Sequence, residues 1–233
     1  MRYLAGMMLL WAVAAGASAS DGPTPFVAVY ELSQGSLAFG RMERRFELKA
    51  NGAYRFSSRM KTSGVLALVR SDKITESSIG QWQDGRFVPA TYSYHNSRGD
   101  KHFALRFDYP TGQVLRSDQA NGWRAAMPAA LLDKLVYQMQ MMVDLAAEPA
   151  TLRYHIADKN KLKDYLFDSR GREEIETDVG RYQAVRLERG ASGTDRRTVV
   201  WCAEELDWLP IKVEYREKDG SVTTAVLHSF STL

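Results

Sequence analysis

Apolar and polar side chains alternate along much of this sequence, and this period of two constrains the fold more than any other feature. Phe103, Leu105 and Phe107, for example, fall on one face of a single stretch, and Arg106 and Asp108 fall on the other. The alternation is clearest in residues 26–32, 102–109, 152–156, 212–216 and 222–230. Successive side chains of a strand point to opposite faces, so the pattern is typical of antiparallel strands with one apolar face. The sequence therefore predicts a mainly β protein.

Turn-forming residues separate these stretches at intervals of roughly ten residues. Glycine, asparagine and aspartate tolerate the positive φ angles of tight hairpins. The turn signals are Asn51-Gly52, Asp84-Gly85, Ser97-Arg98-Gly99-Asp100, Tyr109-Pro110-Thr111-Gly112, Ser169-Arg170-Gly171 and Lys218-Asp219-Gly220. Together they predict about eleven strands. No change in composition and no Ser/Pro-rich linker interrupts the chain, so we expect a single β-rich domain over residues 20–233.

Residues 129–147 have a helical period instead. Apolar side chains recur there at three- and four-residue spacing, namely Leu132, Leu135, Val136, Met139, Met142, Val143 and Ala146. Polar residues, including Asp133 and Gln140, fill much of the opposite face. Pro128 precedes the segment, and Pro149 follows it. We expect one amphipathic helix over residues 129–147, with its apolar stripe packed against the concave face of a curved sheet.

The amino-terminal residues have the form of a secretory signal peptide over residues 1–19. Arg2 supplies a positive charge, residues 4–15 are apolar, and Ala17-Ser18-Ala19 is an A-x-A cleavage site. We expect cleavage after Ala19, which would leave Ser20 as the mature amino terminus. The apolar stretch is shorter than the roughly 20 residues that span a bilayer, so no transmembrane anchor is expected after the signal is removed.

Charge and cysteine content argue against several classes of protein. The formal net charge is only +3 at pH 7, so a nucleic-acid partner is not expected. The single cysteine, Cys202, excludes an intramolecular disulfide framework and a multi-cysteine metal site. It lies in an apolar, β-prone run, and we expect a buried, inert thiol.

No catalytic constellation is recognisable. The sequence lacks Gly-x-Ser-x-Gly, His-Glu-x-x-His, P-loop and Gly-x-Gly-x-x-Gly patterns. The four histidines, His95, His102, His155 and His228, are far apart, and no spacing suggests metal ligands. We therefore expect no enzymatic activity, no cofactor and no metal site.

A set of strand and turn motifs, taken in order, resembles one protein family. The motifs are Tyr30-Glu31-Leu32-Ser33-Gln34-Gly35-Ser36-Leu37-Ala38-Phe39-Gly40, Tyr54-Arg55-Phe56-Ser57-Ser58, Asp72-Lys73-Ile74-Thr75-Glu76, Gln83-Asp84-Gly85-Arg86-Phe87-Val88-Pro89, Tyr92-Ser93-Tyr94, Asp195-Arg196-Arg197-Thr198-Val199-Val200-Trp201, Leu209-Pro210-Ile211-Lys212-Val213-Glu214-Tyr215 and Lys218-Asp219-Gly220. They are specific in combination and weak singly. The combination is similar to the domain of unknown function 3108 (DUF3108), a family of exported Gram-negative bacterial proteins. The resemblance covers nearly all of residues 20–233.

This resemblance implies a β-rich protein of the periplasm. It also implies a fold similar to the periplasmic lipoprotein carriers: a large curved antiparallel sheet, or open barrel, with the helix in its concavity. The family has no established activity, so no catalytic residue carries over, and a shared fold is a weak guide to function.

Two functions from different classes are consistent with these features. The first is a periplasmic protein that binds or carries a hydrophobic ligand, a lipid or an acyl chain, in a β-lined cavity. The candidate ligand contacts are Tyr30, Tyr92, Tyr94, Phe103, Phe107, Leu135, Met139 and Met142. The rival role for each of these side chains is the hydrophobic core that a chain of this size needs. The alternative function is a non-enzymatic envelope scaffold or assembly factor that binds a protein partner through exposed strand edges.

Overall fold

The computed structural model describes residues 22–63, 73–119, 121–190 and 196–233. The expected signal peptide and its cleavage site at Ala17, Ala19 and Ser20 lie outside these residues. The described strands are β1 (Phe26–Gln34), β2 (Leu37–Leu48), β3 (Ala53–Thr62), β4 (Lys73–Gln83), β5 (Arg86–Asn96), β6 (Lys101–Asp108), β7 (Gln113–Arg116), β8 (Arg124–Ala126), β9 (Leu132–Asp133), β10 (Thr151–Asp158), β11 (Lys161–Thr177), β12 (Gly180–Gly190), β13 (Arg197–Ala203), β14 (Leu209–Arg216) and β15 (Val222–Thr232). The helices are α2 (Tyr137–Leu145) and two short 3-10 helices, η1 (Arg98–Asp100) and η2 (Glu204–Leu206).

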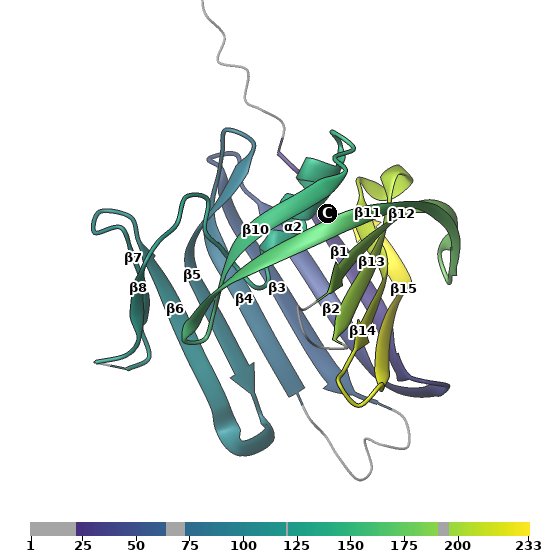
Figure 1. The fold of residues 1–233 in the computed structure, drawn as a ribbon, viewed down its shortest axis with the longest axis horizontal. Coiled ribbons are helices and arrows are strands. Elements are labelled where there is room, and N and C mark those ends of the chain that lie inside the picture. Colours follow the sequence, from purple (N-terminus) through teal and green to yellow (C-terminus); the bar gives the residue numbers. More distant parts are fainter. Residues whose placement is uncertain (1–21, 64–72, 120, 191–195) are drawn as a thin grey trace, which may run out of the picture.

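All of these strands belong to one sheet. Its order is β8-β7-β6-β5-β4-β3-β2-β1-β15-β14-β13-β12-β11-β10-β9, so β1 and β15 pair and join the two halves of the chain. The pairs are antiparallel except for β9 with β10, which is parallel. The sheet curls until β10 and β11 cross over its concave side, with α2 lying between β5 and β10 (Figure 1). The expectation of a large curved antiparallel sheet with one helix in its concavity is confirmed.

The hydrophobic core lies on the concave side, where the alternating apolar residues meet. Phe46, Phe56 and Phe87 are buried there from three different strands. The ring centroid of Phe46 lies 6.3 Å from that of Phe56 and 5.8 Å from that of Phe87, both in edge-to-face geometry. Such aromatic pairs add stabilisation beyond the burial of their area.

The described strands number fifteen rather than about eleven, and two kinds of local pattern misled the prediction in opposite directions. The strands β7, β8 and β9 have four, three and two residues, too short to show alternation. In addition, Ser169-Arg170-Gly171 is not a turn. The strand β11 runs through it, and the register with β12 shifts between Ser169 and Arg172. Gly171 has a φ of 91°, so it provides the bend of a β-bulge within a continuous strand.

The helix is shorter than expected, beginning at Tyr137 rather than at residue 129. Leu132 and Asp133 form β9 instead, opposite Ile156 and Ala157 of β10. The side chain of Asp133 explains the difference, because its Oδ1 accepts the backbone N–H groups of the two residues that follow Lys134, each at 2.8 Å. A carboxylate that accepts nearby N–H groups competes with helical hydrogen bonding.

Side chains, rather than strand pairing, connect β9 and α2 to strands β4 and β5 on the opposite side of the curled sheet. In the described part of the chain the two edges of the sheet are β8 and β9, which do not pair with each other. The Ser78 hydroxyl on β4 donates a hydrogen bond of 2.6 Å to Oδ2 of Asp133. The backbone N–H of Phe87 on β5 donates one of 3.0 Å to Oε1 of Gln140 on α2. Asp133 and Gln140, which the helical pattern placed on a polar outer face, are both buried.

Burial raises the pKa of the Asp133 carboxyl group to about 6, although the hydrogen bonds from Ser78 and from the two backbone N–H groups partly oppose this shift. The folded protein therefore retains a proton at Asp133 over a pH range in which the unfolded chain has lost it. The corresponding stabilisation is complete below the ordinary pKa of 3.8 and is lost as the pH rises through about 6.

We expect Asp133→Asn to remove this pH dependence. A shift of about two pKa units corresponds to about 3 kcal/mol. The free energy of unfolding of the wild type should therefore fall by about that amount, relative to the variant, between about pH 3.5 and about pH 7. Urea unfolding of both proteins across this range measures the difference. Parallel stability curves would show that Asp133 has an ordinary pKa.

Candidate ligand-binding cavity

A cavity of about 370 Å³ opens beside α2. Its wall comes from the start of β5, the turn after β6, residues 127–132 leading into β9, the helix α2, and β10. Most of this wall is apolar. The apolar side chains that line it include Phe87, Val88, Met127, Leu131 and Leu132. The cavity therefore lies where the carboxyl-terminal half of the sheet folds back over the other half and the two walls do not meet completely.

Three polar side chains cross-link one side of the cavity. Gln140 and Asp144 are one turn apart on α2, and Nε2 of Gln140 donates to Oδ1 of Asp144 at 2.9 Å. The Tyr154 hydroxyl of β10 donates to Oδ2 of Asp144 at 3.0 Å. Burial and the Asp144 carboxylate hold the pKa of Tyr154 far above its usual range, so the hydroxyl keeps its proton and continues to donate. Both carboxylate oxygens are thereby occupied, and the network fixes α2 against β10.

The rim of the cavity is basic. Arg86 and Arg153 are exposed there, and neither side chain makes a hydrogen bond or an ion pair with any residue that the structure describes. His155, also at the rim, has its Nδ1 2.6 Å from Oδ1 of Asp164. Tyr109 donates its hydroxyl to the Pro89 carbonyl oxygen at 2.9 Å, and burial raises the pKa of Tyr109 to about 12. The arginines are thus the free charges of this site.

The eight side chains that the sequence suggested as ligand contacts lie elsewhere, and none of them lines this cavity. Seven are buried in the core, namely Tyr30, Tyr92, Phe103, Phe107, Leu135, Met139 and Met142. The eighth, Tyr94, is half-buried and stacks on the ring of Phe103 with centroids 5.2 Å apart. The structure brings Tyr92, Tyr94 and Phe103 together and places Tyr30 in a separate part of the core, where its hydroxyl donates to the Pro210 carbonyl oxygen. Their role as ligand contacts stays a prediction.

Sequence reasoning missed the cavity residues for a physical reason. Gln140 and Asp144 lie on the polar side of the helical pattern, which was assigned to solvent, and residues 127–131 have no periodicity at all. The one usable signal was the position of these polar residues next to the methionine-rich stripe of α2.

The remaining reactive groups have structural partners. His95 contacts Asp100 at 3.0 Å, and His228 contacts Asp178 at 2.5 Å. Cys202 is buried as expected, and burial holds the pKa of its thiol well above the usual range. Among the described residues, no three His, Cys, Asp or Glu side chains are grouped closely enough to hold a metal ion. No helix in the same residues combines the length and apolarity needed to cross a membrane.

The fold and the cavity define a β-barrel-like protein with an apolar site between its helix and its sheet. The sequence matches the family of proteins of unknown function DUF3108 over residues 29–226, and the chain belongs to this family. The resemblance seen in the strand and turn motifs is thereby confirmed. None of the curated proteins matches the sequence.

Among solved structures, the chain is similar to the β-barrel-like protein of domain of unknown function DUF1849 from Brucella abortus. The TM-score is 0.59 at 9% identity, covering 91% of this chain and 99% of that one. This likeness shows a shared barrel-like fold.

Two further structures resemble the chain much more weakly. A putative outer membrane lipoprotein-sorting protein domain from Vibrio parahaemolyticus has a TM-score of 0.25 at 11% identity, covering 90% of this chain and 85% of that one. The MucA/MucB complex of Pseudomonas aeruginosa has a TM-score of 0.18 at 12% identity, with 90% and 93% covered. Neither likeness is strong enough to bear on fold or function.

We expect Gln140→Ala to lower the free energy of unfolding by about 1–3 kcal/mol, because it leaves the Phe87 N–H group without its acceptor and removes the hydrogen bond to Oδ1 of Asp144. Gln138→Ala is the matched control, since Gln138 lies on the same helix and is only partly buried. Urea unfolding of both variants measures the difference. Equal losses of stability would mean that the Gln140 hydrogen bonds contribute nothing beyond the helix itself.

Proposed function

We propose that this protein binds and carries a hydrophobic ligand, a lipid or an acyl chain, in the cavity beside α2. The observation that carries the proposal is a largely apolar cavity of about 370 Å³ with a few fixed polar groups. Ligand sites in proteins are typically concave and mostly apolar, with volumes of about 300–1,000 Å³ and a small number of polar groups that orient the ligand. The size suits one chain of moderate length rather than a whole diacyl lipid.

The polar network of the wall supports this function because it keeps the site preformed. Asp144 accepts hydrogen bonds from both Gln140 and Tyr154, and Gln140 in turn accepts from the backbone of β5. These hydrogen bonds connect α2 to β5 and to β10, which both form walls of the cavity. The walls are therefore held in place without a ligand. A preorganised site avoids part of the ordering cost of binding.

The basic rim suggests which end of the ligand faces outward. Arg86 and Arg153 lack partners among the described residues, and a guanidinium group binds carboxylate or phosphate oxygens in a bidentate manner. A single-chain amphiphile with an acidic head group would place its chain against Phe87 and Leu132 and its head at the arginines.

The proposed setting is the periplasm of a Gram-negative bacterium. The charged start, apolar stretch and A-x-A site of residues 1–19 support export, and the family resemblance agrees with it. We propose that the protein acts there by binding alone, without catalysis or a cofactor. The other candidate, a scaffold that pairs through its strand edges, has less support, because the edge strands β8 and β9 have only three and two residues.

We expect the wild type to bind an uncharged apolar fluorescent probe, N-phenyl-1-naphthylamine, and lauric acid to displace it. Val88→Trp should weaken probe binding about tenfold or more, because the indole fills the cavity next to Phe87. Ala90→Trp is the matched control, since Ala90 is exposed on the same strand outside the cavity wall.

Ala129→Trp, at an exposed position of the rim, provides a second blocking variant if Val88→Trp folds poorly. Native mass spectrometry of protein purified gently from periplasm should show a bound lipid-sized mass. The proposal is wrong if the wild type carries no such mass and binds no probe, or if Ala90→Trp weakens binding as much as the blocking variants do.

A further inference from the structure

A trough of about 710 Å³ lies over strands β3 to β6, lined mainly by side chains of the sheet face that points away from the core. In β3, Tyr54 and Phe56 point into the core, so the alternating residues Arg55, Arg59 and Lys61 project from the opposite face. The trough is therefore separated from the apolar cavity by the sheet itself.

The floor of the trough is made of small side chains in one row across four strands. Ser57 of β3 lies opposite Ser77 of β4, Ser77 lies opposite Ser93 of β5, and Ser93 lies opposite Ala104 of β6. Their small size creates the hollow between longer neighbours. Three of the four carry a hydroxyl group, which can donate a hydrogen bond to a ligand oxygen.

The rim is basic, with Arg55, Arg59, Lys61, Lys73 and His102 among its side chains. Lys61 stands directly opposite Lys73 in the antiparallel pair of β3 and β4. Like charges directly opposite each other destabilise a sheet. Neither lysine forms an ion pair with any residue in the described ranges, so nothing in those ranges compensates for this repulsion.

The carboxylates near the trough interact with residues other than Lys61 and Lys73. Asp100 contacts His95, and Asp118 pairs with Arg116. Glu43 lies directly opposite Arg59 and forms an ion pair with it at 4.0 Å, so this carboxylate does not compensate the two lysines. Glu76, which also borders the trough, pairs with Lys134 at 2.9 Å on the core side of the sheet.

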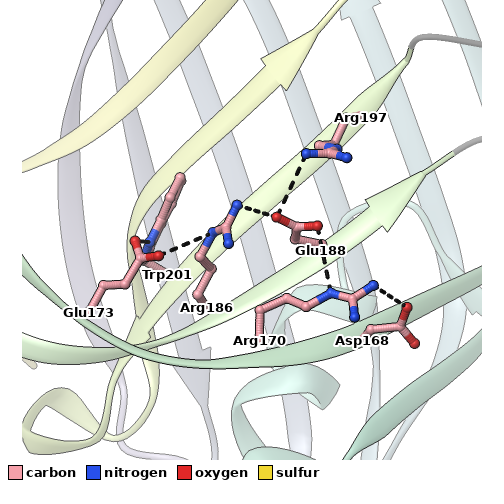
Figure 2. Close-up of polar contacts among 7 residues, drawn as sticks. All are labelled: Asp168, Arg170, Glu173, Arg186, Glu188, Arg197 and Trp201. Atoms are coloured by element: carbon pink, nitrogen blue, oxygen red, sulfur yellow. Dashed lines mark hydrogen bonds and ion pairs between the residues drawn. The ribbon is translucent and has the colours of Figure 1, made fainter.

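On strands β11 to β13, by contrast, the positive charges of several arginines are balanced by nearby carboxylates (Figure 2). Glu188 lies among three arginines: it pairs with Arg186, lies 3.7 Å from Arg170 and lies 3.8 Å from Arg197. Glu173 accepts the indole N–H of Trp201 at 2.8 Å. Arg170, Arg186 and Arg197 thus have an acidic partner on the same surface, whereas Lys61 and Lys73 have none among the described residues.

We propose that the trough is a binding site for a small, multiply anionic ligand that carries phosphate groups. Phosphate oxygens accept hydrogen bonds from lysine, arginine and hydroxyl groups, and a bound phosphate would relieve the repulsion between Lys61 and Lys73. The hollow shape favours a discrete molecule that enters it over a flat membrane surface. This site lies on the other side of the sheet from the proposed carrier cavity, so either can exist without the other.

Titration with tripolyphosphate at constant ionic strength, followed by calorimetry and by thermal unfolding, tests the proposal. The wild type should show saturable binding and a higher Tm with the ligand. Lys61→Gln combined with Lys73→Gln should weaken binding about tenfold or more. The matched control is Lys159→Gln combined with Lys161→Gln, which removes the same charge at the exposed β10–β11 turn.

Two further measurements distinguish binding in the trough from nonspecific attraction of an anion to a basic surface. Ser93→Leu fills the floor without changing the charge and should also weaken binding. Without ligand and at low salt, Lys73→Gln should raise the Tm, because it removes the repulsion from Lys61.

Several results would overturn the proposal. They are a lack of saturable binding by the wild type, equal weakening in the control pair, unchanged affinity in Ser93→Leu, or an unchanged or lower Tm in ligand-free Lys73→Gln. Binding to phosphatidylglycerol vesicles without binding to tripolyphosphate would also contradict the proposal, because it would show that the trough binds a membrane surface rather than a small ligand. Because the apolar probe reports on the other face, its binding should be unaffected by the lysine variants.

Discussion

The hydrogen bonds of one buried carboxyl group, Asp133, hold the interior of this barrel in place. Oδ1 takes the backbone N–H groups of Leu135 and Val136, and Oδ2 takes the Ser78 hydroxyl of β4. The Tyr54 hydroxyl, 3.1 Å from Ser78, extends the chain to β3. A polar group without partners in such a site would cost several kcal/mol, so these contacts define one position for the segment. Because residues 127–132 lead directly into it, the wall of the cavity depends on the same contacts.

The parts of the fold that were predictable from sequence are those determined by near neighbours. Alternation within a strand and a turn such as Asn51-Gly52 depend on adjacent residues, and the structure has both. The start of the helix depends on more than near neighbours: Asp133 accepts the N–H groups of Leu135 and Val136, but its buried position is fixed by Ser78, which is 55 residues away. Gly171 shows the same limit: its positive φ suits a turn or a bulge equally, and the pairing of β11 with β12 decides between them.

The candidate site was harder to predict because periodicity indicates which side of a strand faces inward, but not where two inner walls fail to meet. Side chains such as Phe46 and Phe56 interdigitate and fill the interior. The apolar space remains beside the hydrogen bonds by which Gln140 connects α2 to β5 and Asp144 connects α2 to β10. Gln140 and Asp144, which border this cavity, are therefore residues whose polarity in the sequence predicts exposure to solvent.

Charge distribution distinguishes the ion-paired surface around Glu188 from the surface proposed to bind an anion. Around Glu188 each arginine has a nearby acid, so the charges of β11 to β13 stabilise the fold locally and leave no net attraction for an anion. Lys61 and Lys73 oppose each other without such a partner in the described residues, which lowers stability. Local conflicts of this kind are expected at functional sites, where a sequence is not optimised for folding alone. The same reasoning applies to Arg86 and Arg153 at the rim of the cavity, so both proposals rest on cations without a partner among the described residues, rather than on the most basic stretches of sequence.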